Sequence, residues 1–217
     1  MRGCLRIFRD ETLIQLGIVV GKQKEIVIIG IDGSGKDKQA EILSADGKAA
    51  VIKLTDYDPK HKIFRTLAKL PNKLILEGEK KGRKKLVVAG YTGHSLLFGP
   101  YHLIKKWEKD STGKPKEKVV YVRHPLFDAE ALAAVYGKGK LKSIIKGLAK
   151  FASISKRPHE IYLMEIPPRI AMERIKRRGK GIQMHENEKS LERMAQVYSK
   201  LANEAEKKGI KVYRKRM

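Results

Sequence analysis

Short apolar runs recur along the chain and are separated by longer amphipathic or polar segments. Each run has four to seven residues, and the run at residues 25–30 is continuous, which is typical of a strand buried on both faces of a parallel sheet. The first run, EIVIIG, ends in a glycine that can begin a tight turn. The predicted strands span residues 25–30, 49–54, 119–122, 160–166 and 210–214.

Helical periodicity occupies the segments between these strands. The apolar positions of LKSIIKGLAKF repeat at helical spacing, with lysines on the opposite face, which predicts an amphipathic helix. A shorter helix is predicted where Ile63, Leu67 and Leu70 share one face. Four predicted helices cover residues 61–70, 86–107, 141–151 and 190–208. Two others are predicted to begin at Lys36 and at Pro168. Strands that alternate with helices predict an α/β fold, in which a parallel sheet of about five strands lies between two helical layers.

Composition limits the class of protein. The 217 residues suit one domain with a buried core, and no apolar run approaches the roughly 20 residues of a membrane span. The first residues make a poor secretory signal, and the single cysteine excludes an internal disulfide framework. We therefore expect an intracellular, cytoplasmic protein.

The charge balance is unusual. The chain carries 48 Lys and Arg against 24 Asp and Glu, a net charge of +24. A solvated lysine-rich surface is the simplest explanation, but acidic residues do not balance the lysines. The excess predicts attraction to polyanions such as nucleotide phosphates, nucleic acid or polyphosphate. Aromatic residues make up only 6%, so few stacking platforms for single-stranded nucleic acid are expected.

The segment GIDGSGK follows the first predicted strand and opens a predicted helix, the context that a phosphate-binding loop requires. Glycines let backbone N–H groups converge on phosphate oxygens, and the helix N-terminus adds positive potential. Lys36 would reach the β- and γ-phosphates. The sequence therefore predicts a nucleotide site made of Gly30, Asp32, Gly33, Ser34, Gly35, Lys36, Asp37 and Lys38.

Asp37 departs from the usual loop, in which a serine or threonine hydroxyl at this position ligates Mg²⁺. A carboxylate is also a hard oxygen ligand, so Asp37 could replace the hydroxyl, with Asp32 assisting through water. Without a metal, its charge would face phosphate at a cost of roughly 4 kcal/mol for two charges about 4 Å apart. Asp37 therefore makes nucleotide binding more dependent on metal, or else suppresses it.

Three stretches resemble the thymidylate kinase family: IVIIGIDGSGKDKQAEIL, EIYLMEIPPRIAMERIKRRGKG and HENEKSLERMAQVYSKLANE. They are similar to the family's phosphate loop, its Pro-Pro turn with an arginine-rich helix, and the helix after the lid. The resemblance covers about residues 25–214. It implies a P-loop NTPase fold, a lid at about residues 176–189 and a possible homodimer. It also implies ATP and Mg²⁺ as cofactors. Residues 1–24, which precede the first predicted strand, are expected to form an N-terminal extension.

The segment VVYVRHPLFD stands where the family has a strand followed by aspartate, arginine, and tyrosine or histidine. Arg123 and His124 match, but Val122 replaces the aspartate. Arg123 would lie between donor and acceptor phosphates, where its fork suits bidentate contact. The lid would bring Arg174, Arg177 or Arg178 over the transferring phosphoryl group; Arg177 and Arg178 are the catalytic candidates. A solvated basic helix end is the alternative for these arginines.

The segment DYDPKHKIFR is the predicted acceptor-side loop. Asp58 would lie at its turn, Arg65 could hold the acceptor phosphate, and Phe64 could stack on a base or simply lie in the core. The family's arginine for the substrate base has no counterpart near AGYTGHS, which puts thymine recognition in doubt.

Three functions remain open at this stage. The first is a kinase that moves the γ-phosphate of ATP to a nucleoside monophosphate, with dTMP as the acceptor that the resemblance suggests. The second is a polyphosphate-dependent nucleotide kinase, whose loops also lack the serine or threonine. The third is a non-catalytic nucleotide- or RNA-binding protein on a degenerate kinase fold, which Asp37 and Val122 favour.

Overall fold

A computed structural model describes residues 23–53, 59–106, 113, 116–136, 158–179, 181–183 and 185–217. Within them, five parallel strands form one sheet in the order β2-β3-β1-β4-β5. The strands are β1 (Lys24–Ile29), β2 (Ala49–Lys53), β3 (Lys118–Val122), β4 (Glu160–Glu165) and β5 (Lys211–Arg216). All five strands therefore lie where the apolar runs predict them, to within two residues at each end.

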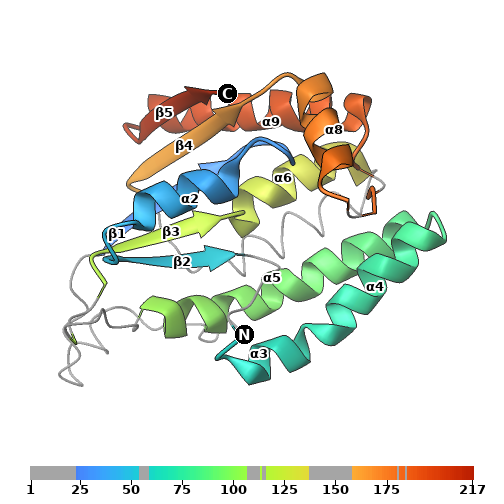
Figure 1. The fold of residues 1–217 in the computed structure, drawn as a ribbon, viewed down its shortest axis with the longest axis horizontal. Coiled ribbons are helices and arrows are strands. Elements are labelled where there is room, and N and C mark those ends of the chain that lie inside the picture. Colours follow the sequence, from blue (N-terminus) through green and yellow to red (C-terminus); the bar gives the residue numbers. More distant parts are fainter. Residues whose placement is uncertain are drawn as a thin grey trace, which may run out of the picture.

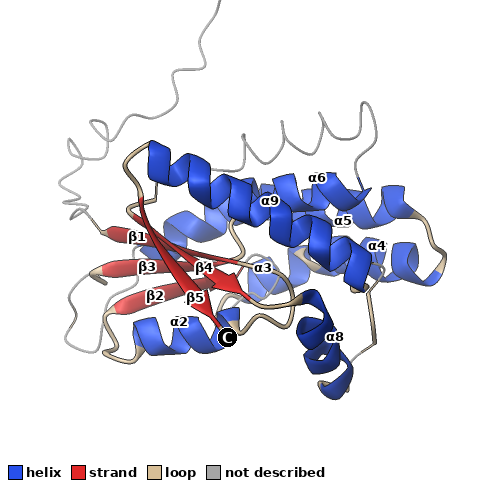
Figure 2. Ribbon diagram, turned by 90° about the horizontal axis from the view of Figure 1, so that it is seen from above, coloured by secondary structure: helices blue, strands red, loops and turns tan. Residues whose placement is uncertain are grey.

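Helices cover both faces of the sheet (Figure 1). In the view from above, α2 lies on one side, and α9, α6, α5 and α4 lie on the other (Figure 2). This arrangement confirms the predicted three-layer α/β architecture with a five-stranded parallel sheet. The helices are α2 (Lys36–Ser44), α3 (Lys62–Leu67), α4 (Lys69–Lys80), α5 (Lys84–Lys106), α6 (Pro125–Tyr136), α8 (Pro168–Arg177) and α9 (Glu188–Lys207).

The predicted helix over residues 61–70 is wrong in its extent. The chain forms α3 to Leu67 and then a separate α4 that continues to Lys80, beyond the predicted end. The face on which Ile63, Leu67 and Leu70 were predicted to lie is not a buried one, because all three side chains are more than half exposed. Phe64 is instead the buried residue of α3, and α4 turns Pro71, Ile75 and Gly78 inward.

Helix α6 was not predicted. Its apolar residues lie all round the helix, so no polar face marks the helical period. Pro125 at its first position was the available signal, because proline is favoured there. The predicted helix 141–151 lies outside the described residues, as do residues 1–22 of the predicted N-terminal extension.

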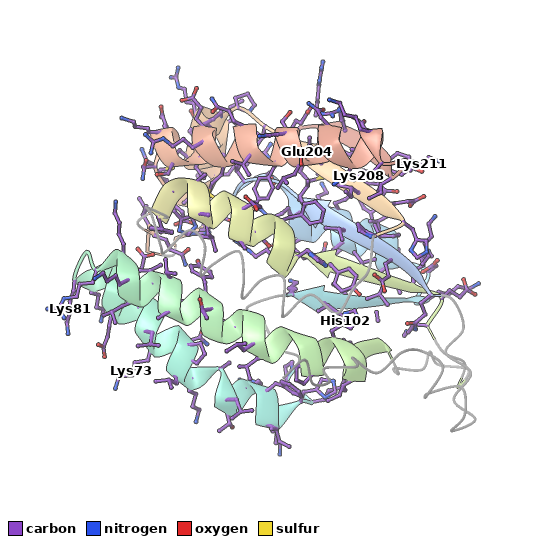
Figure 3. All side chains as sticks on the ribbon, turned by 180° about the vertical axis from the view of Figure 1, so that it is seen from behind. Lys73, Lys81, His102, Glu204, Lys208 and Lys211 are labelled. Atoms are coloured by element: carbon purple, nitrogen blue, oxygen red, sulfur yellow. The ribbon has the colours of Figure 1, made fainter. Side chains whose placement is uncertain are left out.

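The core is made mainly by the strands. Val27 and Ile29 of β1, Tyr121 of β3 and Ile161 of β4 are almost fully buried and pack with α9 residues such as Tyr198. Lysines lie around the outside: Figure 3 shows Lys73 and Lys81 on the outer side of α4, and Lys208 and Lys211 near the start of β5. Every helix in the described part of the chain is too short or too polar to span a lipid bilayer.

Candidate functional site

The loop between β1 and α2 has the backbone of a phosphate cradle. Gly30, Gly33 and Gly35 have φ angles of 149°, 78° and 85°, a range that side chains other than glycine rarely adopt. Gly33 also lies close to α8, since a Cβ there would be 2.7 Å from the backbone oxygen of Ala171. Gly35 is the N-cap of α2, so the helix N-terminus points into the loop.

Lys36 begins α2 and is buried, with 7% of its surface exposed. Its ammonium donates hydrogen bonds of 2.7 Å to the backbone oxygens of Gly30 and Ile31. Burial lowers the pKa of Lys36, while the nearby Asp32 carboxylate opposes this shift. The lysine that would hold donor phosphates therefore lies across its own loop in this structure.

Asp32 is the electrostatic centre of the site. One carboxylate oxygen contacts the Arg123 guanidinium and lies 3.6 Å from Lys36 Nζ. The other accepts a 2.9 Å bond from His185 Nε2, and His185 Nδ1 accepts from the Tyr136 hydroxyl at 3.0 Å. Burial alone would raise the pKa of Asp32, but Arg123, Lys36 and His185 hold it well below its ordinary value.

Arg123 directly follows β3 and adopts a φ of 66°, in the left-handed region that is uncommon for arginine. Its contact with Asp32 raises its pKa further above the ordinary arginine value. Strained backbone of this kind is frequent where a side chain is held for function. The turn aims the guanidinium back toward the phosphate loop.

A second buried carboxylate lies behind Arg123. Asp128 of α6 accepts a 2.5 Å hydrogen bond from the Tyr198 hydroxyl through Oδ1. Its Oδ2 is buried and has no hydrogen-bond partner among the described residues. Burial raises the pKa of Asp128, although Arg123 and Tyr198 act in the opposite direction. Asp128 therefore lies near Arg123 but on α6, whereas Val122 ends β3.

Asp37 lies at the mouth of the site, with 67% of its side chain exposed. Its Oδ1 is 2.7 Å from the ammonium of Lys53, the last residue of β2. In the sheet register, Lys53 pairs with Val122 on β3. A cation from the neighbouring strand thus meets the unusual aspartate of the loop.

Helix α8 supplies arginines from the other side. Arg174 approaches the Gly33 oxygen at 3.4 Å, and Arg178 donates to both carboxylate oxygens of Glu186 at 2.5 and 2.7 Å. Arg174 and Arg178 line the same cleft as the phosphate loop, whereas Arg177 does not line it. Glu186 therefore holds Arg178 at the edge of the cleft.

These elements enclose a cleft of about 490 Å³ at the carboxyl ends of β1, β2 and β3. Ligands of open α/β sheets bind at this edge. Five basic and two acidic side chains line it, a net charge of +3. The lining residues with charge are Asp32, Lys36, Asp37, Lys53, Arg123, Arg174 and Arg178. The cleft is thus built for an anion with several negative charges.

The acceptor-side predictions fall in other places. Asp58 lies outside the described residues. Phe64 is buried with its ring 5.2 Å from that of Tyr101, and Arg65 is exposed on α3. His124 is fully buried between the rings of Tyr121 and Phe127, and burial lowers its pKa to about 3. The structure does not bring Phe64, Arg65 or His124 into the cleft with Arg123.

Of the two predicted Mg²⁺ ligands, Asp37 and Asp32, Asp37 is better placed to bind a metal ion. Asp37 offers an exposed carboxylate beside the phosphate loop, as an oxygen-ligand site requires, once Lys53 moves aside. Both oxygens of Asp32 already bond to basic groups. Asp37 is accordingly the better candidate, and Lys38, exposed on α2, adds positive charge nearby.

Several contacts of the site were not found from the sequence, although Asp128 had been a possible substitute for the aspartate expected at Val122. Lys53 ends a predicted strand, but nothing in its neighbours marks it as a partner of Asp37. His185 and Glu186 fall at the end of the predicted lid, where their burial could not be foreseen. Asp128 and Tyr198 are 70 residues apart, and only the packing of α6 against α9 joins them.

The comparison with known proteins agrees with this geometry. The family model described as thymidylate kinase matches residues 28–215, which is nearly the whole chain. The match runs from β1 through the phosphate loop, Arg123 and α8 to β5.

Proposed function

Because the chain belongs to the thymidylate kinase family, we propose that it transfers the γ-phosphoryl group of ATP to a nucleoside monophosphate. The family supports a nucleotide kinase function, and dTMP is the acceptor to test first. The cleft carries the proposal: a glycine loop, a helix N-terminus and a net charge of +3 meet at one sheet edge. Phosphoryl transfer needs mainly this positioning and positive charge.

Lys36 would hold the donor phosphates. Its ammonium would leave the Gly30 and Ile31 oxygens and bond phosphate oxygens at the same end of α2. The exchange replaces two neutral acceptors by charged ones, which make stronger hydrogen bonds. The backbone N–H groups of the loop would orient the phosphate chain.

Arg123 would bridge donor and acceptor phosphates. Asp32 holds its guanidinium beside the phosphate loop, so Arg123 needs no large movement to reach a phosphate in the cleft. Arg178 would approach from α8 and stabilise the charge that develops on the transferring group. Arg174 is placed to assist, since it lines the same cleft.

Asp37 would hold Mg²⁺ on the phosphate chain, and a bound Mg²⁺ would neutralise charge on the β- and γ-phosphates. The carboxylate takes the place of the hydroxyl that usually stands in this position. The contribution of the protein is to keep Asp37 at the mouth of the cleft, where the first turn of α2 places it.

An ATP-consumption assay with Mg²⁺ over a panel of nucleoside monophosphates tests the proposal. The matched variant is Asp37→Ser, which restores the usual hydroxyl. Transfer to dTMP by the native protein supports the full proposal, and transfer only to another acceptor keeps the kinase but rejects dTMP. Absence of transfer to every acceptor, by both proteins and with ATP bound, would refute it.

A second candidate is a nucleotide-binding protein without catalysis. It is favoured by Val122, an apolar side chain that lines the cleft where the family resemblance leads us to expect a carboxylate. Activity that is absent from the native protein and gained in Asp37→Ser would support this candidate. Transfer from polyphosphate but not from ATP would instead support a polyphosphate-dependent kinase.

A further inference from the structure

We propose that Lys53 is a built-in counter-cation of the phosphate loop, which competes with Mg²⁺ for Asp37 and lets the loop bind a phosphate chain with little metal. The proposal rests on the proposed function, because it concerns the same nucleotide site. It assigns a role to a residue at the end of β2, outside the loop itself.

Lys53 and Asp37 are in direct contact. Lys53 Nζ lies 2.7 Å from Asp37 Oδ1, the separation of a direct charge-assisted hydrogen bond. Both residues line the cleft, so the pair lies in the ligand site and not on a remote surface. Lys53 ends β2, and Asp37 lies in the first turn of α2. Two rigid elements therefore place the pair.

The residues around the Lys53–Asp37 pair leave Asp37 as the carboxylate that a metal ion would meet. Val122 is the neighbour of Lys53 in the sheet register, and its side chain offers no oxygen ligand. The other carboxylate of the cleft, Asp32, already contacts Arg123, Lys36 and His185. Of the acidic side chains that line the cleft, Asp37 alone is held by a single partially exposed cation. A metal ion entering the cleft would meet Lys53 at this carboxylate.

Charge accounting gives the consequence. An unpaired Asp37 would repel the phosphate chain, and a metal ion would then be needed to neutralise it. With Lys53 in contact the pair is neutral, and the other charged lining residues, four basic and one acidic, give the cleft a charge of +3 without any ion. Mg²⁺ that binds Asp37 must share the carboxylate with Lys53 or displace it, so its gain in affinity for the nucleotide is reduced.

The test measures two ATP dissociation constants by calorimetry, one in excess EDTA and one in saturating Mg²⁺. The ratio of the value in EDTA to the value in Mg²⁺ reports how strongly the metal improves ATP binding. Lys53→Met should raise this ratio by about tenfold, because the metal no longer competes with an ammonium and metal-free ATP meets an unpaired carboxylate. The pair is partly exposed, so a modest factor is expected. Lys53→Arg should stay within about threefold of the native ratio.

The matched control is Lys48→Met. Lys48 precedes β2 at the opposite end of the same strand and pairs with an exposed carboxylate, Glu117, at 3.1 Å. It removes one positive charge outside the cleft and should change the ratio by less than about twofold. In the Asp37→Asn background, Lys53→Met should change the ratio by less than about threefold.

Two results overturn the proposal. One is an unchanged ratio in Lys53→Met, and the other is an equal change in the native and Asp37→Asn backgrounds, which would make Lys53 a simple phosphate contact. If ATP does not bind at all, the series is repeated with inorganic tripolyphosphate, and failure of that anion to bind also overturns it. These readouts need no acceptor, so absence of phosphotransfer rejects the proposed function and leaves this inference to its own test.

Discussion

Replacing Asp32 by asparagine removes the one negative charge shared by Arg123, Lys36 and His185, while it keeps the size of the side chain. Removing one partner of a buried ion pair typically costs about 3–5 kcal/mol, since the remaining charge stays buried and uncompensated. The Arg123 side chain is 26% exposed, and Lys36 keeps two backbone acceptors. We therefore expect a loss near the lower limit, about 3 kcal/mol.

Urea unfolding followed by circular dichroism at neutral pH measures this loss, which corresponds to about a 150-fold change in the unfolding equilibrium. The control is Asp46→Asn, which breaks an exposed contact of 2.6 Å with Lys118 and should change stability little. Added tripolyphosphate should stabilise Asp32→Asn more than the native protein, because a bound anion replaces the lost charge.

The pH dependence has a defined sign. Because the folded pKa of Asp32 lies below its ordinary value, its contribution to stability is present above about pH 3.8 and is lost as pH falls through the folded pKa. Asp32→Asn should lack this acid loss. A variant within about 1 kcal/mol of the native protein at neutral pH would refute the view that Asp32 holds the site together.

Three other substitutions test the site and its surroundings. Acidification from pH 7 to pH 5 should lower the free energy of unfolding by about 2 kcal/mol less in His124→Phe than in the native protein. The buried neutral histidine has a pKa of about 3, so over this pH range only the unfolded chain takes up the proton. An equal pH dependence of the two proteins in urea titrations would contradict this. Gly33→Ala should cost about 2–3 kcal/mol in the same unfolding assay, because its Cβ would meet the backbone of α8. The control is Gly47→Ala. Gly47 has a similar φ of 70° but open space around it, so this variant should cost only about 1 kcal/mol. Arg178→Gln should lower kcat/KM for phosphotransfer by about 100-fold, and Arg177→Gln by less than about threefold. Of these two arginines, only Arg178 lines the cleft. Similar losses in the two variants would show that this geometry does not distinguish them.

The sheet could be predicted almost completely from the sequence. Strands β1 to β4 are largely buried and leave apolar runs, and the mostly exposed edge strand β5 was marked by the shorter run of Ile210, Val212 and Tyr213. The phosphate loop was equally visible, since its glycines, lysine and flanking elements are contiguous. Helix α6 was missed because it has no polar face to reveal its period. The boundary between α3 and α4 was missed because exposed residues such as Ile63 and Leu67 imitate an inward face.

The site was only half visible, for a different reason. Asp32, Lys36 and Asp37 lie in one contiguous segment. Lys53 reaches Asp37, and Arg123 and His185 reach Asp32, only through the order of the strands and the position of the segment before α9. Contacts between residues far apart in the chain leave no local pattern in a single sequence. The roles predicted for Arg123, Arg178 and Asp37 remain predictions for the assays above.

The bond from His185 to Asp32 joins residues that are 153 positions apart. It links the segment before α9 to the loop after β1, so that opening either segment breaks this buried bond. Amide protons in the two segments should therefore exchange with solvent at similar rates, with one shared opening free energy. His185→Ala should separate the two, with residues 185–187 exchanging faster and the phosphate loop retaining the slow exchange that the buried strand β1 gives it.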